Sequence, residues 1–185
     1  MKHPHHWALC LTLILNACGG STDTPTSSCN AAQGSHLLTG TVTAVHDGDT
    51  LTLDMGDRTE HIRLQGIDAP ELAQAFGNDA KLALAKQTLQ QTVRVAYSQR
   101  DHYDRVLGQV FTADCTDVNL QLLNRGWAWF YKAYACDLDS PRRFDYAAAE
   151  AQASRLRLGL WRQSKPIAPW IFRNSEDPPA PSCTV

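Results

Sequence analysis

This chain is organised around two segments, residues 45–50 (VHDGDT) and residues 62–71 (IRLQGIDAPE). Each segment joins an apolar run typical of a β-strand to a group of acidic residues, and the second segment also contains an arginine. Carboxylate oxygens suit a small divalent cation such as calcium or magnesium. Arginine suits a phosphate, because its planar guanidinium donates paired hydrogen bonds to anionic oxygens. Together these residues indicate phosphodiester chemistry.

The pattern around these segments predicts an α+β fold, a five-stranded barrel of the OB type with three helices. Alternating apolar residues predict strands, Ala- and Leu-rich runs predict helices, and Gly, Pro and Asp mark the turns between them. A helix after the third of five short strands is typical of a small closed barrel. Ser140 is the expected N-cap of the last helix. The expected strands cover residues 37–45, 50–54, 58–64, 92–97 and 106–112, and the expected helices cover residues 73–91, 117–126 and 140–159.

The first residues have the pattern of an export signal. A polar start with one lysine precedes about eight apolar residues, and small residues follow, so residues 1–17 are expected to be a signal peptide. Residues 15–18 (LNAC) also resemble a bacterial lipobox, in which Cys18 becomes the first residue and carries lipid. Ordinary signal cleavage with release of a soluble protein into the periplasm or the medium is the alternative.

The remaining chain divides into three parts by composition. Residues 18–36 are rich in Gly, Ser, Thr and Pro and are expected to form a flexible tether. Residues 37–173 are long enough for one domain with its own core. Residues 174–185 contain three prolines and are expected to be an irregular tail.

The charge of the chain argues against one class of nucleic-acid-binding protein. The sequence has 17 basic and 19 acidic residues, and loss of Lys2 with the signal would leave 16 basic residues. Proteins that hold nucleic acid by overall electrostatic attraction are strongly basic. Any polyanion must therefore bind through a local basic patch or through a metal ion.

Six cysteines are present, and an exported chain would use four of them in disulfides. Cys10 is lost with the signal and Cys18 is the expected lipidation site. Three pairings of the other four are possible; we favour Cys115–Cys136 within the domain and Cys29–Cys183 between its flanks. The spacing lacks the close cysteine pairs of a structural zinc site.

Several motifs together resemble the thermonuclease family, the staphylococcal-nuclease-like proteins. Each motif alone is weak evidence for the family. Together the motifs follow the family's order and spacing, and the match covers essentially all of residues 37–173. The motifs are VHDGDT at 45–50, IRL and GIDAPE within 62–71, Asp101 with Tyr103 and Arg105, Gly159-Leu160-Trp161, and the tail Pro169-Trp170 with Arg173.

The resemblance implies a role for each matching residue. Asp49 and Asp68 match the carboxylate ligands of one catalytic calcium ion, and the main-chain carbonyl of Ala69 matches a further ligand. Calcium is implied rather than magnesium. The other matches are Glu71 to the residue that orients or deprotonates the attacking water, Arg63 and Arg105 to the pair that binds the scissile phosphate, Tyr103 to a tyrosine beside the nucleotide, and Asp47 to a carboxylate behind the metal ligands.

Taken singly, these residues have simpler interpretations. Asp47-Gly48-Asp49 is a common composition for a solvated turn, and Arg63 within a strand often makes a surface ion pair of little energetic value. Acidic residues 68–71 could lie near the N-terminus of the following helix, and Arg105 could be paired within its loop. The functional interpretation is favoured because all of these residues occur together.

One residue departs from the family pattern. Glycine is common immediately before the second arginine of the family, whereas this chain has Asp104. If that position needs a positive φ, aspartate tolerates it better than most side chains but less well than glycine. Its carboxylate could also pair with Arg105 and compete with the phosphate.

These observations predict an exported, lipid-anchored, calcium-dependent nuclease facing the periplasm or the cell surface. We expect it to be a monomer without a protein partner, and to hydrolyse DNA and RNA with little sequence specificity, leaving 3′-phosphate ends. A non-catalytic nucleic-acid-binding or interaction module on the same barrel is the alternative from another class. A calcium-stabilised structural lipoprotein is a third.

Overall fold

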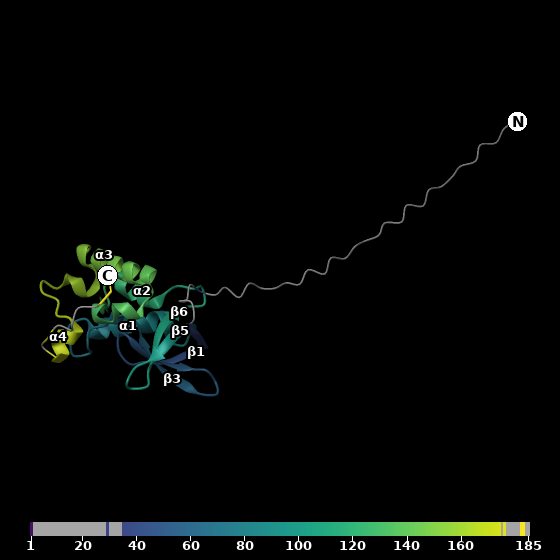
Figure 1. Ribbon diagram of the computed structural model, residues 1–185, viewed down its shortest axis with the longest axis horizontal. Coiled ribbons are helices and arrows are strands. Elements are labelled where there is room, and N and C mark those ends of the chain that lie inside the picture. The colour runs from purple at the N-terminus through teal and green to yellow at the C-terminus, as the bar shows by residue number, and fades with distance from the viewer. Residues whose placement is uncertain (2–28, 30–34, 175, 177–181, 184–185) are drawn as a thin grey trace.

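The computed structural model describes residues 35–174 together with residues 1, 29, 176, 182 and 183 (Figure 1). The signal peptide, the lipidation site Cys18 and nearly all of the tether lie outside the described residues. Among the described residues, no helix has the length and apolarity needed to cross a bilayer. The elements in chain order are β1 (His36–Val45), β2 (Thr50–Asp54), β3 (Thr59–Leu64), β4 (Ile67–Asp68), α1 (Gly77–Thr88), β5 (Thr92–Arg100), β6 (Val106–Phe111), α2 (Val118–Asn124), β7 (Trp129–Phe130), the 3-10 helix η1 (Lys132–Asp137), α3 (Ser140–Arg155), the 3-10 helix η2 (Gly159–Arg162) and α4 (Pro169–Asn174).

Five strands form a closed barrel in the order β1-β2-β3-β6-β5, and β5 pairs with β1 to close it. Only the β3–β6 pair is parallel, with Ile62 opposite Val106 and Leu64 opposite Gly108. Closure leaves no free sheet edge on the barrel. The predicted fold class is therefore confirmed.

The barrel interior is filled by the inward-facing half of each strand, as the alternating pattern predicts. Apolar side chains from all five strands form one core that continues into the helices. The residues of the five barrel strands in this core that are at most 1% exposed are Val42, Leu51, Leu53, Ile62, Leu64, Val93, Val95, Val106 and Val110.

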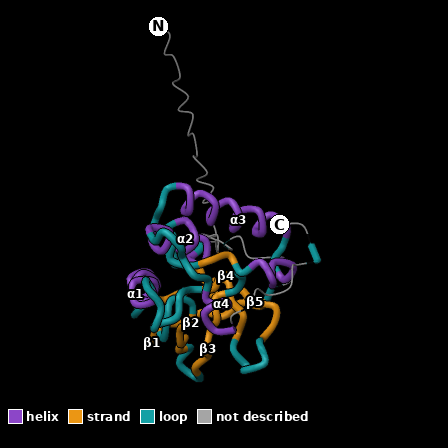
Figure 2. Tube along the Cα trace, turned by 90° about the vertical axis from the view of Figure 1, so that its left-hand side faces the viewer, coloured by secondary structure: helices purple, strands orange, loops and turns teal. Residues whose placement is uncertain are grey.

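Helices α2 and α3 lie at one end of the barrel, with α2 between α3 and the strands, and α1 lies beside the barrel (Figures 1 and 2). Two details differ from the prediction for the last long helix. Asp139, not Ser140, is its N-cap, and the Asp139 carboxylate accepts a hydrogen bond of 2.9 Å from the main-chain N–H of Arg142. Helix α3 also ends at Arg155, earlier than predicted.

Short elements that the pattern did not predict complete the fold around the pocket described below. Strands β4 and β7 pair antiparallel, with Asp68 opposite Trp129. Helix α4 comprises only six residues. Elements this short carry too little periodicity to be detected from sequence.

The favoured disulfide pairing is wrong. The bonds are Cys29–Cys115 and Cys136–Cys183, with Cα atoms 5.0 and 5.6 Å apart. Cys29 lies in a small apolar cluster with Ala96 of β5 and Phe111 of β6, and Cys115 packs against this cluster. Cys183 instead bonds to Cys136, which lies in η1. Topology brings these cysteines together, and sequence spacing does not reveal it.

Candidate active site

An open pocket of about 730 Å³ gathers the predicted site residues. Its walls come from the β1–β2 loop, the β3–β4 segment, the β5–β6 loop, η1 and α4. All eight residues predicted for metal, phosphate, water and nucleotide line it: Asp47, Asp49, Arg63, Asp68, Ala69, Glu71, Tyr103 and Arg105. The fold thus brings together side chains from widely separated parts of the chain.

Close packing of the β1–β2 loop places Asp49 at the pocket. A Cβ atom on Gly48 would lie 2.5 Å from the Cβ of Ala69 and 2.7 Å from the Cβ of Ala80, so only glycine fits there without movement. The next residue is anchored as well, because the main-chain carbonyl of Asp49 accepts a hydrogen bond of 2.8 Å from the N–H of Leu64. Asp49 is therefore fixed to both β3 and the β4 region.

Asp49 is 5% exposed, and both of its carboxylate oxygens accept hydrogen bonds. Its Oδ2 accepts a hydrogen bond of 2.6 Å from the N–H of Ala69, and its Oδ1 accepts one of 3.2 Å from the Thr50 hydroxyl. Oδ1 also lies 3.2 Å from Nε of Arg63. Asp47 supports the loop, since its Oδ1 accepts a hydrogen bond of 3.0 Å from the Asp49 N–H.

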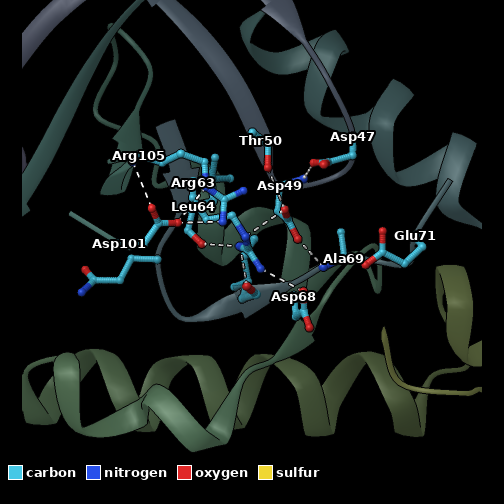
Figure 3. A network of polar contacts seen from close by, with 12 residues as sticks. Asp47, Asp49, Thr50, Arg63, Leu64, Asp68, Ala69, Glu71, Asp101 and Arg105 are labelled. Carbon is cyan, nitrogen blue, oxygen red and sulfur yellow. Dashed lines mark hydrogen bonds and ion pairs between the residues drawn. The ribbon is translucent and has the colours of Figure 1, made fainter. Parts of the chain in front are cut away.

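Arg63 is locked at the centre of the site (Figure 3). One terminal nitrogen donates to the main-chain carbonyls of Leu64 and Ile67, both at 2.8 Å. The other donates to Oδ1 of Asp68 at 2.8 Å, while Nε faces Asp49. The Arg63 side chain is only 13% exposed, and it contacts both predicted metal ligands, Asp49 and Asp68.

Burial dominates the electrostatics of this centre. Desolvation, with smaller contributions from the nearby charges of Asp47 and Asp68, raises the pKa of Asp49 to about 7 against the opposing attraction of Arg63. Burial alone would lower the pKa of Arg63, but the charges of Asp49, Asp68 and Asp47 outweigh it and raise that pKa overall. Arg63 is therefore a permanent cation beside a carboxylate that titrates near neutrality.

Arg105 lies on the side of Arg63 away from Glu71 (Figure 3). Its Nε and one terminal nitrogen each lie 2.7 Å from Oδ2 of Asp101, whose Oδ1 accepts the main-chain N–H of Tyr103 and of Arg105 at 2.9 and 3.0 Å. Burial opposes ionisation of Asp101, but these hydrogen bonds prevail and lower its pKa. Asp101 was not predicted as a site residue, although its place in the motif marked it.

The structure shows both the backbone conformation of Asp104 and the partner of its carboxylate. Its φ is +63°, so the position does adopt the left-handed conformation that favours glycine. The expected competition for Arg105 is wrong, because the Asp104 carboxylate is 88% exposed and lies 3.7 Å from Arg100 instead. Asp101 holds Arg105 in its place.

Glu71 joins the site through a residue to which no role was assigned from the sequence, Arg173 of α4. One terminal nitrogen of Arg173 donates to Oε1 of Glu71 at 2.6 Å, and the other donates to Oδ2 of Asp68 at 2.8 Å. Its only sequence signal was the tail motif Pro169-Trp170…Arg173, which gives no contact partner. Arg173 thus bridges the proposed base and a proposed metal ligand.

The donor set of the pocket fits a hard divalent cation. Six carboxylates and four arginines line it, an excess of two negative charges. Two carboxylates, Asp49 and Asp68, are linked through Arg63 at distances of 3.2 and 2.8 Å. Within the described part of the chain, no three His, Cys, Asp or Glu side chains gather as a metal cluster. A cation here would need main-chain oxygen or water in addition to the two carboxylates.

Comparison with known proteins agrees with the motifs. Residues 61–163 match the family model described as staphylococcal nuclease homologue. An uncharacterised endonuclease of Escherichia coli is 36% identical over 135 residues, covering 73% of this chain and 84% of that protein. An uncharacterised endonuclease of Haemophilus influenzae is 38% identical over 136 residues, covering 73% and 72%. A micrococcal nuclease of Shigella flexneri is 35% identical over 144 residues, covering 74% and 80%.

Proposed function

The chain belongs to the staphylococcal nuclease family, and we propose that it is a calcium-dependent nuclease that hydrolyses DNA and RNA with little sequence specificity. The observation that carries the proposal is the convergence, in one pocket, of two buried carboxylates, a partly exposed third carboxylate and several arginines. A binding module would gain nothing from burying Asp49 and Asp68 beside a phosphate site, since like charges repel.

Arginine side chains prepare the pocket for the scissile phosphate. Arg63 is held rigidly, and Arg105 is held by Asp101 with its side chain 31% exposed. Preorganised positive charge favours the charge that develops on the non-bridging oxygens. Asp49, Asp68 and the Ala69 carbonyl would hold the calcium ion, which when bound neutralises phosphate charge.

Glu71 orients and deprotonates the attacking water. Its side chain is 36% exposed, so both water and substrate can approach it. Its carboxylate takes a proton as the water oxygen bonds to phosphorus, and the bond from phosphorus to the 5′ oxygen breaks. That oxygen leaves and takes a proton from solvent, so the products carry 3′-phosphate and 5′-hydroxyl ends, as the family resemblance implies.

The decisive experiment measures the rate at which the protein without its expected signal peptide (residues 18–185) cleaves single-stranded DNA, duplex DNA and RNA, in the presence of calcium or of a chelator. Glu71→Gln removes the base but keeps the shape of the side chain, so we expect its rate to fall by at least about 100-fold. End-group analysis of the products checks for 3′-phosphates. Equal cleavage with and without chelator would overturn calcium dependence, and unaltered cleavage by Glu71→Gln would overturn the assigned base. Binding of nucleic acid without cleavage would favour the non-catalytic module.

We also propose that the protein is exported and anchored through lipid on Cys18. The two disulfides of the domain support an oxidising compartment. Labelling of growing cells with radioactive palmitate should mark the wild-type protein and not Cys18→Ser. Release of unlabelled wild-type protein into the soluble fraction would favour ordinary signal cleavage.

A further inference from the structure

Asp68 has both carboxylate oxygens occupied by arginine. Arg63 donates to Oδ1 at 2.8 Å, and Arg173 donates to Oδ2 at 2.8 Å and also approaches Oδ1 at 3.4 Å. A calcium ion binds carboxylate oxygen at about 2.3–2.6 Å. A calcium ion on Oδ2 would therefore lie no more than about 5.4 Å from the Arg173 nitrogen, which is 2.8 Å from the same oxygen. Two cations this close repel strongly, so one arginine must withdraw when calcium binds.

The two arginines differ in their freedom to withdraw. Arg63 makes two further hydrogen bonds to main-chain carbonyls, and its side chain is only 13% exposed. Arg173 makes its charge-pair contacts with Asp68 and Glu71, and its side chain is 37% exposed. Movement of Arg173 breaks no contact with the barrel backbone among those described, so Arg173 is the residue that can leave.

Contacts that do not involve this guanidinium hold helix α4 in place. The ring of Trp170 stacks on Tyr131 with centroids 5.2 Å apart and meets Trp129 edge-on at 5.7 Å. Gln74 also donates a hydrogen bond of 3.1 Å to the main-chain carbonyl of Ile167, just before the helix. The aromatic contacts keep Arg173 near the carboxylates even when its side chain has moved away.

We propose that Arg173 is a built-in counter-ion of the active site that calcium must displace. This inference rests on the proposed calcium dependence. In the metal-free protein Arg173 neutralises Asp68 and Glu71. Calcium binding drives it off Asp68 and thereby also frees the Glu71 oxygen that it holds at 2.6 Å. Arg173 therefore sets the calcium concentration at which the site assembles, and it couples cation binding to exposure of the base.

The test is calorimetric titration of the mature protein with calcium, independent of turnover. Loss of one positive charge about 5 Å from a divalent ion should tighten binding about tenfold in Arg173→Gln. Arg173→Lys keeps the charge but loses the two-pronged donor, so its affinity should lie between those of the wild type and Arg173→Gln. In chelator, Arg173→Gln should melt at a lower temperature than wild type, because its carboxylates lack a counter-ion. Calcium should remove that difference.

Arg162→Gln is the matched control, since Arg162 is exposed in η2 and outside the pocket lining. It should leave calcium affinity unchanged. An Arg173→Gln affinity within twofold of wild type, a weaker affinity, or an equal shift in Arg162→Gln would each overturn the proposal. If the wild type binds and uses calcium while Arg173→Gln is unchanged, only this inference fails. If neither protein binds calcium and neither cleaves, the proposed function fails with it.

Discussion

Acidification should weaken calcium binding, because Asp49 must lose its proton to act as a ligand. Its pKa is raised to about 7 by burial within a group that includes Asp47, Asp68 and Arg63. A free aspartate is ionised well below neutrality. Changing the pH around 7 therefore alters the charge of Asp49, while ordinary carboxylates stay ionised.

The size of the effect follows from that pKa. Asp49 is about half ionised at pH 7 and about 1% ionised at pH 5. The apparent calcium association constant should fall about tenfold for each pH unit below 7, and about 100-fold between pH 8 and pH 5. Calcium should release close to one proton per ion at pH 6 and almost none at pH 9.

The assay is calorimetry with calcium at pH 5 to 9 in buffers of different ionisation enthalpy, which reports the protons released. An affinity that is flat from pH 8 to pH 5, or proton release that is absent at pH 6, would refute the assignment of Asp49 as a titrating ligand. Asp49→Asn should bind calcium weakly and lose the pH dependence centred near 7. Survival of that dependence in Asp49→Asn would assign it to another group.

Stability without calcium tests the same group with a definite sign. The pKa of Asp49 is higher in the folded state than the ordinary value of 3.8. Its stabilising contribution is therefore complete below about pH 4 and is lost as the pH rises through about 7. In chelator the melting temperature should decline between pH 5 and pH 8, and calcium should reverse the decline. A rise over that range in chelator would contradict the assignment.

Two substitutions, Gly48→Ala and Asp104→Gly, test the backbone around the site, and Gly56→Ala is the control for the first. Gly48→Ala forces a Cβ against Ala69 and Ala80, so overpacking should cost about 2 kcal/mol of stability, lower Tm by about 7 °C and reduce cleavage. Gly56 has a φ of +90° and no neighbour within 4 Å of an added Cβ, so Gly56→Ala should lower Tm without loss of cleavage. Equal Tm and activity for Gly48→Ala and wild type would disprove the packing argument. Asp104→Gly should preserve or raise cleavage, because φ of +63° suits glycine and the lost carboxylate faces Arg100; a large fall in rate would show that this carboxylate assists catalysis.

Local pattern was sufficient for the barrel. Alternation in residues such as Val93 and Val95 directly encodes which side of a strand is buried, and this pattern persists over five segments. The positions of Asp49, Arg63 and Asp68 in one pocket also follow from the resemblance, since their motifs occur in order. Helix ends were less certain: Asp139 and Ser140 are both good N-caps, and only backbone geometry selects Asp139.

Contacts between distant segments were beyond the reach of that pattern. Cys29 and Cys115 are 86 residues apart, and Cys136 and Cys183 are 47 apart, so their pairing depends on how the barrel closes and where the chain returns. The choice of Asp101 rather than Asp104 as the partner of Arg105 depends on a single left-handed residue that turns one side chain outward.

Periodicity and local motifs were enough to predict the barrel and the family, and to nominate the residues proposed to bind a cation and a phosphate. Which charged side chains meet depends on the folded chain. Arg173 lies 105 residues after Asp68 in the chain, yet it holds Asp68 and Glu71 because aromatic packing places α4 beside β4. Ion pairing depends on distances of a few ångströms, and those distances exist only after the whole chain has folded.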